Sequence, residues 1–329
     1  MSAPHLLATL RRRAAGLDRT IVLPEADDPR IQEAALAAVR LQLVRPLLIS
    51  SGKAPAPEGI DVLAPGDDPR LRHMAENIAA SPIARGRSVD RIQEQLLDPL
   101  FYACALVRDG RADAAVMGAV ATTAATLRAA LGVIGVDRRY QVVTSCFLME
   151  LPDRVLVYAD CGVVPQPTAE QLADIAIQAA ESYRSRVGGE PHVALLSFST
   201  HGSARHGMLE PVLNALEILK ERGVDFPIDG ELQADAALVP AVARRKARDS
   251  PVAGRANVLV FPDLNSGNIA YKITERLAGA RAVGPLLQGL ALPVHDLSRG
   301  CSSEDILDTM AIAALDAESM ARPDPRRQA

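Results

Sequence analysis

The chain has 329 residues, of which 48% are hydrophobic, and no compositionally biased tract interrupts it, so we expect globular cores in two domains. Its net charge is -4 and its arginines are scattered, which excludes the basic surface typical of proteins that bind nucleic acid. The sequence has no uninterrupted apolar run of about 18 residues, which excludes a transmembrane helix.

The first part of the chain alternates short apolar strands with amphipathic helices. We expect strands over 20–26, 44–50 and 112–120, and helices over 28–42, from about Asp68, and over 88–110. Such alternation is typical of a parallel sheet that helices cover on both faces. The first part is therefore predicted to form an α/β domain.

The pattern changes near Tyr140. Residues 140–160 hold two apolar runs separated by Leu-Pro-Asp-Arg, which predicts an antiparallel hairpin and a domain boundary. The alternation then resumes, with helices expected over 169–186, 205–222, 236–247 and 266–280, and strands over 192–199, 224–230, 257–263 and 282–290. A last helix is expected to include the apolar run 306–315.

Polar side chains follow several of the predicted strands. Ligands of open parallel sheets bind beyond the carboxyl ends of the strands, so these residues are candidates for a binding site. The candidates for substrate binding are Thr122, Thr123, Ser199, Asn265 and Ser266. Each of them alone is typical of a helix cap, because hydroxyl and amide oxygens accept hydrogen bonds from free N–H groups at a helix start. Their repetition along one sheet edge favours a binding site.

Spacing excludes several familiar sites. Residues 202–207 have the glycine spacing of a phosphate-binding loop, but Met208 and Leu209 stand where that loop needs lysine and a hydroxyl. No Gly-x-Gly-x-x-Gly follows the first strand, and the six histidines lack metal-binding spacing. The four cysteines are widely separated, which fits a reducing cytoplasm. We therefore expect no metal and no dinucleotide cofactor.

The segment 296–305 concentrates polar side chains at the predicted start of the last helix. Ser302 followed three residues later by Asp305 approximates a capping box, and Gly300 supplies a turn. Arg299 has the wrong charge for the positive end of a helix dipole. A bound anion would remove this conflict, because helix N-termini hold anions through free N–H groups. A capped helix and an anion site are both open interpretations from the residues alone.

Five stretches closely resemble phosphate acetyltransferases, also known as phosphotransacetylases. In chain order they are VLPEADDPRI, GAVATTAATLRAAL, LLSFSTHGSARH, DGELQADAAL and the long stretch from FPDLNSGNIAYKITERLAG to HDLSRGCSSEDI. The resemblance implies reversible transfer of an acetyl group between coenzyme A (CoA) and orthophosphate. Its implied ligands are acetyl-CoA, CoA, phosphate and acetyl phosphate, without a metal or other cofactor. It also implies a homodimer.

The resemblance further implies a fold. We expect two three-layer α/β/α domains with mostly parallel sheets, similar to isocitrate and isopropylmalate dehydrogenases, and an active site in the cleft between the domains. Domain I is expected to comprise residues 1–140 and 286–329, so that the C-terminal helix completes it. Domain II is expected to comprise residues 141–285.

Carried over residue by residue, the family's signature falls on Ser298, Arg299, Cys301 and Asp305, with a further anion-binding arginine at Arg128. Asp305 is the implied base, since a free thiol with a pKa of about 8.5 is mostly protonated at neutral pH. The two arginines would hold phosphate, and Ser298 would donate a hydrogen bond to the thiol or the developing oxyanion. We expect Cys301 to be a small residue of the turn rather than an acyl carrier.

Some positions depart from the family's pattern. Ala121, His201 and His295 replace residues that are commonly histidine, lysine and asparagine, and the match at Arg85 and Arg87 is weak. Three alternatives follow: transfer of another acyl group such as butyryl, a catalytically silent domain that senses acetyl-CoA, and, from the fold alone, an oxidoreductase. The intact signature disfavours a silent domain, and the missing metal-binding carboxylates disfavour an oxidoreductase of the isocitrate dehydrogenase type.

Overall fold

The computed structural model describes residues 6–50 and 57–321, and contacts between residues divide the chain into two compact units. The unit that we name the N-terminal unit comprises 7–139 and 290–321, and the central unit comprises 140–289 with Leu6. The expected α/β class with mostly parallel sheets is confirmed. The expected return to the first domain at residue 286 lies inside strand β10 (Arg281–Gln288), so the central unit extends to Gly289.

The N-terminal unit is built on a parallel sheet with the strand order β11-β4-β1-β2-β3. The strands are β1 (Thr20–Leu23), β2 (Arg45–Ile49), β3 (Asp61–Leu63), β4 (Ala114–Met117) and β11 (Val294–Asp296). β3 and β11 were not expected, because three residues are too few to show an alternating pattern. β4 lies between β1 and β11, so the loops that follow these three strands leave the same edge of the sheet.

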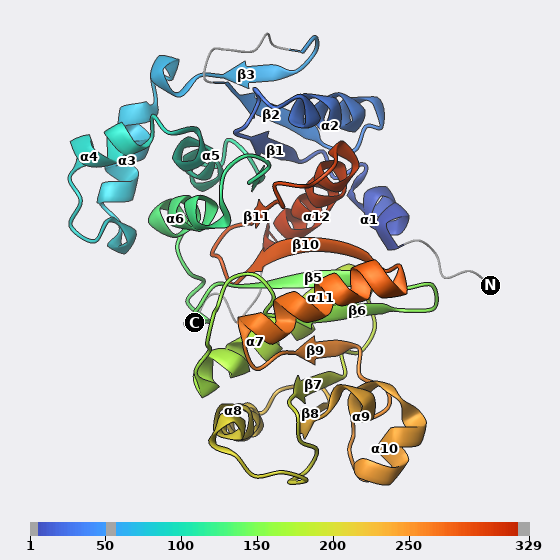
Figure 1. The fold of residues 1–329 in the computed structure, drawn as a ribbon. Helices are drawn as coiled ribbons and strands as arrows, with labels where there is room; N and C mark the ends of the chain where they lie inside the picture. Colours follow the sequence, from blue (N-terminus) through green and yellow to red (C-terminus); the bar gives the residue numbers. More distant parts are fainter. Residues whose placement is uncertain (1–5, 51–56, 322–329) are drawn as a thin grey trace. The chain divides into compact units, whose positions relative to one another are not determined.

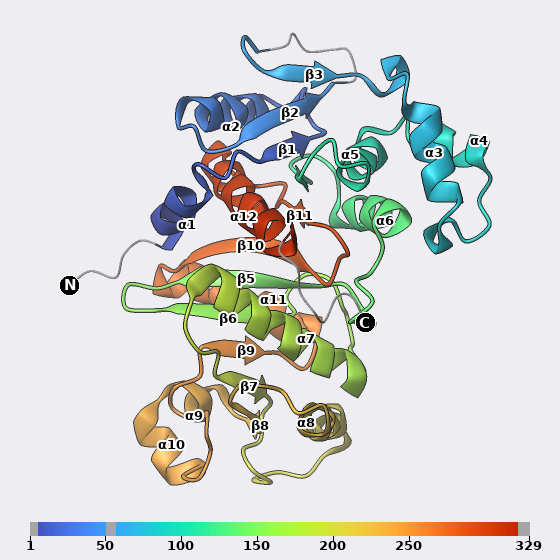
Figure 2. The same cartoon turned by 180° about the vertical axis from the view of Figure 1, so that it is seen from behind.

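Helices cover both faces of this sheet. The helices of this unit are α1 (Leu6–Ala14), α2 (Pro29–Arg40), α3 (Leu71–Ala79), α4 (Val89–Gln95), α5 (Pro99–Arg108), α6 (Thr123–Val133) and α12 (Ser303–Ala321). α2 packs with α12 on one face, and α5 packs with α6 on the other (Figures 1 and 2). The single helix expected over 88–110 is divided, because Asp98 caps a new helix whose first residue is Pro99.

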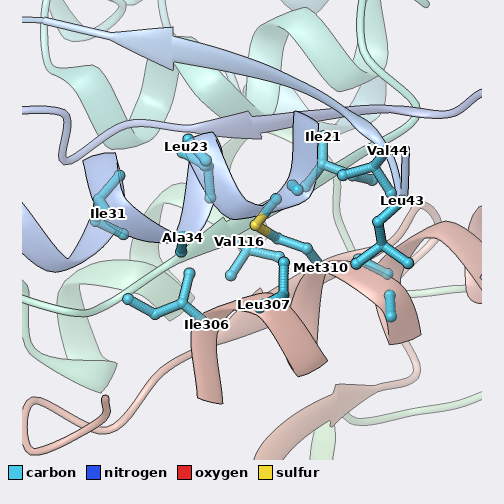
Figure 3. Packing of buried hydrophobic residues seen from close by; sticks show 14 of the residues in the cluster. Ile21, Leu23, Ile31, Ala34, Leu43, Val44, Val116, Ile306, Leu307 and Met310 are labelled. Carbon is cyan, nitrogen blue, oxygen red and sulfur yellow. The ribbon is translucent and has the colours of Figure 1, made fainter. Parts of the chain in front are cut away.

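The core of the N-terminal unit lies between the sheet, α2 and α12. Figure 3 shows side chains from all three meeting there, among them Leu23, Ile31, Val116, Ile306, Leu307 and Met310. α12 is amphipathic only weakly, because its apolar run is buried over several turns. The last helix of the chain therefore completes the core of the first 139 residues, and it fixes the loop that precedes it.

The central unit has a sheet with the strand order β10-β5-β6-β9-β7-β8. Its remaining strands are β5 (Thr144–Glu150), β6 (Val155–Ala159), β7 (Val193–Leu196), β8 (Ile228–Leu232) and β9 (Val258–Val260). The expected hairpin over 140–160 is confirmed as the antiparallel pair β5 and β6, and β10 is antiparallel to β5. The other pairs of neighbours are parallel.

Helices cover both faces of the central sheet too. They are α7 (Ala169–Ser182), α8 (Glu210–Glu221), α9 (Ala234–Leu238), α10 (Pro240–Lys246) and α11 (Leu264–Ala278). α11 crosses the face turned to the viewer in Figure 1, and α7 crosses the face seen in Figure 2. The helix expected over 236–247 is interrupted before Pro240. None of the helices within 6–50 and 57–321 has the length and apolar character that crossing a bilayer requires.

The position of α12 in the core predicts the effect of truncating Leu307. Its side chain is 2% exposed, so Leu307→Ala should lower the free energy of unfolding by about 2–5 kcal/mol through lost burial and a residual cavity. Leu41→Ala is the matched control in the same unit, because that side chain is 57% exposed and its loss should change stability by about 0.5 kcal/mol or less. Urea unfolding of both variants measures the difference. Equal losses would contradict the core position of α12.

Candidate active site

The loop 297–302 connects β11 to α12 and presents Ser298 and Arg299 to solvent. Its turn is closed by two hydrogen bonds: the Ser298 carbonyl oxygen accepts from the Cys301 N–H at 2.9 Å, and Ser298 Oγ accepts from the Gly300 N–H at 3.3 Å. Among the described residues, nothing forms a hydrogen bond or ion pair with the Arg299 guanidinium. The loop therefore exposes a hydroxyl and an uncompensated positive charge side by side.

Arg30, in the first turn of α2, holds this loop in place. Its Nη1 donates to the carbonyl oxygens of Arg299 at 2.9 Å and Cys301 at 2.8 Å, and its Nη2 donates to the carbonyl oxygen of Ala119 at 2.8 Å. Asp28, the N-cap of α2, accepts from Arg30 Nη2 at 2.8 Å. One guanidinium thus links the loops after β4 and β11 to the start of α2.

Arg30 was not identified from the sequence, although a signal was present. A cation in the first turn of a helix faces the positive end of the helix dipole, which is the argument that drew attention to Arg299. In the run Asp-Asp-Pro-Arg, the position of Arg30 at the start of α2 therefore indicates a partner outside its own helix.

The loop after β4 is organised by the carboxylate of Glu25, which follows β1. Glu25 Oε2 accepts from the N–H groups of Gly118 and Ala119, both at 2.8 Å, and Oε1 accepts from Val120 at 2.9 Å and Ala121 at 2.7 Å. Four consecutive N–H groups therefore point at one carboxylate. This arrangement defines the path of the chain into α6.

α6 carries three of the residues predicted to bind substrate. Thr122 is its N-cap and accepts from the Ala125 N–H at 3.2 Å, while Thr123 Oγ1 donates to Asp296 Oδ2 at 2.6 Å. Arg128 lies further along the helix with an exposed side chain, and no partner for its guanidinium occurs in 6–50 and 57–321. The structure thus gives the two threonines structural contacts and leaves the arginine available to a ligand.

Asp296 is an unusual carboxylate, because it is 1% exposed and its Oδ1 has no hydrogen-bond partner among the described residues. Burial raises the pKa of this carboxyl to about 6, the nearby charge of Glu25 adds to the rise, and the hydroxyls of Thr123 and Thr126 oppose it. The carboxyl fits only because residue 118 is glycine, since a Cβ there would lie 2.3 Å from Asp296 Oδ1.

Asp305 forms the capping box that its spacing predicted. Ser302 donates to Asp305 Oδ2 through its N–H at 2.9 Å and through Oγ at 2.8 Å, and the Asp305 N–H donates back to Ser302 Oγ at 3.2 Å. The capped-helix interpretation is confirmed.

Cys301 lies with the apolar side chains of the core and is 8% exposed. Burial raises the pKa of its thiol to about 11, although the nearby Arg30 guanidinium opposes the shift. At neutral pH the side chain is a thiol rather than a nucleophilic thiolate. These observations support its expected role as a small residue of the turn.

The other three predicted residues lie in the central unit. Ser199 is fully buried, and its Oγ donates to Glu231 Oε1 at 2.8 Å, so the structure does not support a ligand contact there. Ser266 Oγ donates to the carbonyl oxygen of Asp263, the N-cap of α11, at 2.8 Å. Asn265 is exposed at the start of the same helix. Two of the three residues thus belong to the helix start rather than to an evident polar cluster.

An apolar pocket of about 320 Å³ lies at the carboxyl ends of β7 and β9 in the central unit. Sequence analysis identified one of its lining residues, Ser266, as a candidate for binding; the others are Leu196, Ser197, Phe198, Met208, Leu209, Ala234, Phe261 and Pro262. Phe198 and Met208 are 51% and 63% exposed. Exposed apolar side chains in loops have no sequence pattern that separates them from core residues, so the sequence did not predict this pocket.

Three of the positions that depart from the family's pattern or match it weakly have internal partners. His201 Nε2 lies 3.0 Å from Asp229 Oδ2, and the buried His295 Nε2 lies 2.9 Å from Asp316 Oδ2. Arg87 donates to the carbonyl oxygens of Gly132 at 2.7 Å and of Ile83 at 3.1 Å, which favours a structural role. In the described part of the chain, no group of three or more His, Cys, Asp or Glu side chains is arranged to hold a metal ion.

Known proteins resemble this chain over nearly its whole length. The sequence profile of the family described as phosphate acetyl/butaryl transferase matches residues 5–314. A protein of Paracoccus denitrificans, named phosphate acetyltransferase, is 46% identical over 94% of this chain and 98% of its own. A solved phosphotransacetylase from Streptococcus pyogenes is 37% identical with a TM-score of 0.90, over 97% of this chain and 100% of its own.

The expected likeness in fold to dehydrogenases is also present. A 4-hydroxythreonine-4-phosphate dehydrogenase from Klebsiella pneumoniae matches 93% of this chain and 100% of its own with a TM-score of 0.50. Its identity is 13%, so this likeness concerns the fold alone.

The buried Asp296 predicts a pH dependence of stability. Because folding raises its pKa from the ordinary 3.8 to about 6, its protonated form stabilises the fold below about pH 4, and this contribution is lost as the pH rises through 6. The shift corresponds to about 3 kcal/mol. Asp296→Asn does not ionise, so its free energy of unfolding relative to the wild type should rise by about that amount between pH 4 and pH 7. Urea unfolding across this range measures the difference, and a difference independent of pH would contradict it.

Proposed function

Because the chain belongs to the phosphate acetyl/butaryl transferase family, we propose that it catalyses the reversible transfer of an acetyl group between acetyl-CoA and orthophosphate. One observation carries the proposal: the exposed pair Ser298 and Arg299 directly precedes the helix start that Asp305 caps. This arrangement places a hydrogen-bond donor, a cation and a carboxylate within the eight residues 298–305, at the start of α12. Acyl transfer to and from phosphate needs these three groups.

The proposed phosphate ligands are Arg299 and Arg128. Both side chains are exposed, and the described part of the chain provides no carboxylate or carbonyl partner for either guanidinium. A guanidinium binds phosphate oxygens through two parallel N–H groups, so it restrains the orientation of the anion as well as its position. Phosphate and acetyl phosphate are small, strongly charged anions that such groups select.

The proposed reaction begins with the thiol of CoA. The carboxylate of Asp305 accepts the S–H proton, and the thiolate attacks the carbonyl carbon of acetyl phosphate. A C–S bond forms, the C–O bond to phosphate breaks, and phosphate leaves with the bonding electron pair. Ser298 Oγ–H donates to the acyl oxygen as negative charge develops on it. The reverse reaction uses the same groups in the opposite order.

The acyl chain is the part of the proposal with a close alternative. The family's description includes butyryl transfer, while the P. denitrificans relative is named for acetyl transfer. One or two methylenes change binding by about 1–3 kcal/mol, so the two substrates should be compared directly.

We also propose that the chain acts as a homodimer, in the cytoplasm and without a metal or other cofactor. The dimer has one supporting observation in the central unit: Ile269, Ile273 and Leu277, spaced by one helical turn along α11, are 56%, 52% and 82% exposed. An apolar stripe of this kind is typical of a surface that another chain covers. The location and the absence of a cofactor stay predictions from the sequence.

The purified protein should form a thioester from acetyl phosphate and CoA. The assay follows the thioester bond spectrophotometrically in the presence of a chelator, with butyryl phosphate as the parallel substrate. Higher kcat/KM with acetyl phosphate supports the proposal as stated, and higher kcat/KM with butyryl phosphate would assign the alternative acyl group. Absence of transfer from either substrate would identify a silent member of the family.

The two roles of Asp305 are separated by Asp305→Asn and its control Ser302→Ala. If Asp305 is the base, Asp305→Asn should lower kcat by about 10²–10⁴-fold, and raising the pH should partly restore it by supplying free thiolate. Ser302→Ala removes the partner in the capping box but leaves the carboxylate, so it should cost about 1 kcal/mol of stability with little loss of kcat. Turnover and melting temperature are measured for both. Similar, small changes in kcat would reduce Asp305 to a cap.

A further inference from the structure

The proposed chemistry does not use Asp296, although this carboxylate lies next to the residues that perform it. It is the last residue of β11, two positions before Ser298. The side chain is 1% exposed and therefore out of reach of a substrate. Whatever it contributes must act through its neighbours.

The neighbours of Asp296 connect the two proposed phosphate ligands. Asp296 begins the chain segment that leads to Arg299, and its Oδ2 accepts from Thr123 Oγ1 at 2.6 Å. Thr123 is the first residue of α6, the helix that carries Arg128. This hydrogen bond therefore joins the loop that bears one arginine to the helix that bears the other.

The segment 118–123, which leads from β4 into α6, is held from both sides of β4. Glu25, after β1, accepts from the N–H groups of residues 118–121, while Asp296, at the end of β11, accepts from the Thr123 hydroxyl. β1 and β11 are the two neighbours of β4 in the sheet. The segment 118–123 is thus held by Glu25, which follows β1, and by Asp296, the last residue of β11. β11 is the strand that leads to Ser298 and Arg299.

A purely structural contact does not require this carboxylate. A threonine hydroxyl is satisfied by a neutral acceptor, yet the residue present is an aspartate whose Oδ1 is buried and has no hydrogen-bond partner among the residues that the structure describes. The backbone also gives it room, because Gly118 at φ +100° is the only residue type that leaves space for Oδ1. A buried charge that lowers stability and lies beside a catalytic loop is typical of a functional position.

We propose that Asp296 is a positioning residue for phosphate, which acts through Thr123 to set the loop of Arg299 against the helix of Arg128. The inference rests on the proposed function and adds to it. A charged acceptor makes the stronger hydrogen bond, so the ionised carboxylate holds Thr123 and the start of α6 more firmly than a neutral group would. Affinity for phosphate should then follow the ionisation of Asp296.

The charged groups around Asp296 are compatible with this dependence. Glu25 is the one that faces it closely from the β1 side, and Arg30 binds the carbonyl oxygen of Ala119 beyond it. On β11, His295 pairs with Asp316 of α12. From α6, the described neighbours are the neutral hydroxyls of Thr123 and Thr126. Burial raises the pKa of Asp296 to about 6, so the change should appear between pH 7.5 and pH 5.5.

The first test removes the hydrogen bond and the charge separately. Thr123→Val should raise the KM for orthophosphate about tenfold at pH 7.5, with kcat changed less than about threefold, because a charge-assisted hydrogen bond is lost but the catalytic groups remain. Asp296→Asn should raise the same KM by about three- to tenfold. Thr123→Ser, which keeps the hydroxyl, should recover most of the loss. The KM for acetyl-CoA should stay within about twofold in all three.

The second test is the pH profile and the double variant. The ratio of wild-type to Asp296→Asn kcat/KM for phosphate is compared at pH 7.5 and 5.5, because the titration of phosphate itself cancels in a ratio. The ratio should fall by at least about half as the wild-type carboxylate becomes protonated. The double variant Asp296→Asn/Thr123→Val should be no worse than Thr123→Val alone, because both changes break one interaction.

The control is Asp113→Asn, at the opposite end of β4. Asp113 accepts from the Thr20 N–H at 2.7 Å and from Arg19 Nη1 at 2.9 Å, so its loss should lower the melting temperature without changing the KM for phosphate. A KM for phosphate within twofold of wild type in Thr123→Val, additive effects in the double variant, or a ratio independent of pH would each overturn the inference. Failure of the proposed function looks different, because the wild type itself would then transfer no acyl group.

Discussion

Backbone N–H groups that follow the end of a parallel strand need acceptors, and after β4 a single carboxylate supplies them. Glu25 accepts four hydrogen bonds from residues 118–121, two on each oxygen. The path of this loop sets where α6 begins, and with it the positions of Thr123 and Arg128. Because the acceptor lies two residues beyond the neighbouring strand β1, the start of α6 is held by the sheet as well as by its own helix.

Three carbonyl oxygens at the same edge of the sheet accept hydrogen bonds from a positively charged side chain. Arg30 donates to the carbonyl oxygens of Ala119, Arg299 and Cys301, so an internal guanidinium complements the internal carboxylate of Glu25. These two residues use their charges inside the unit. Within 6–50 and 57–321, the guanidinium groups of Arg299 and Arg128 have no internal partner, which distinguishes arginines that build the site from arginines that are available to a ligand. An exposed guanidinium without an internal partner keeps its full capacity for a phosphate group.

Two aspartates near this edge illustrate how stability and function compete. Asp305 satisfies the start of α12 and is also the base of the proposed reaction, so one carboxylate combines a cap with chemistry. Asp296 is buried, one of its oxygens has no hydrogen-bond partner in the described part of the chain, and the burial opposes its ionised form. Burying a carboxylate lowers the free energy of unfolding, so a buried carboxylate indicates that its contact serves function rather than stability.

The sequence by itself determined the α/β class, the hairpin at 140–160 and the capping box of Ser302 and Asp305, because periodicity, turns and caps depend on residues close together in the chain. The resemblance of five stretches also determined the family and located Ser298 and Arg299 in one loop. Contacts between distant residues had no such signal. β11 exists because three residues pair with β4, which lies about half the chain away, and Arg30 binds carbonyl oxygens 269 and 271 residues further on. The resemblance also implied that the C-terminal helix completes the first domain. Only the tertiary structure decided that Ser199 is buried and that Asp296 joins β11 to α6. Each of these depends on which strands become neighbours, and that is settled by packing of the whole chain rather than by any local pattern.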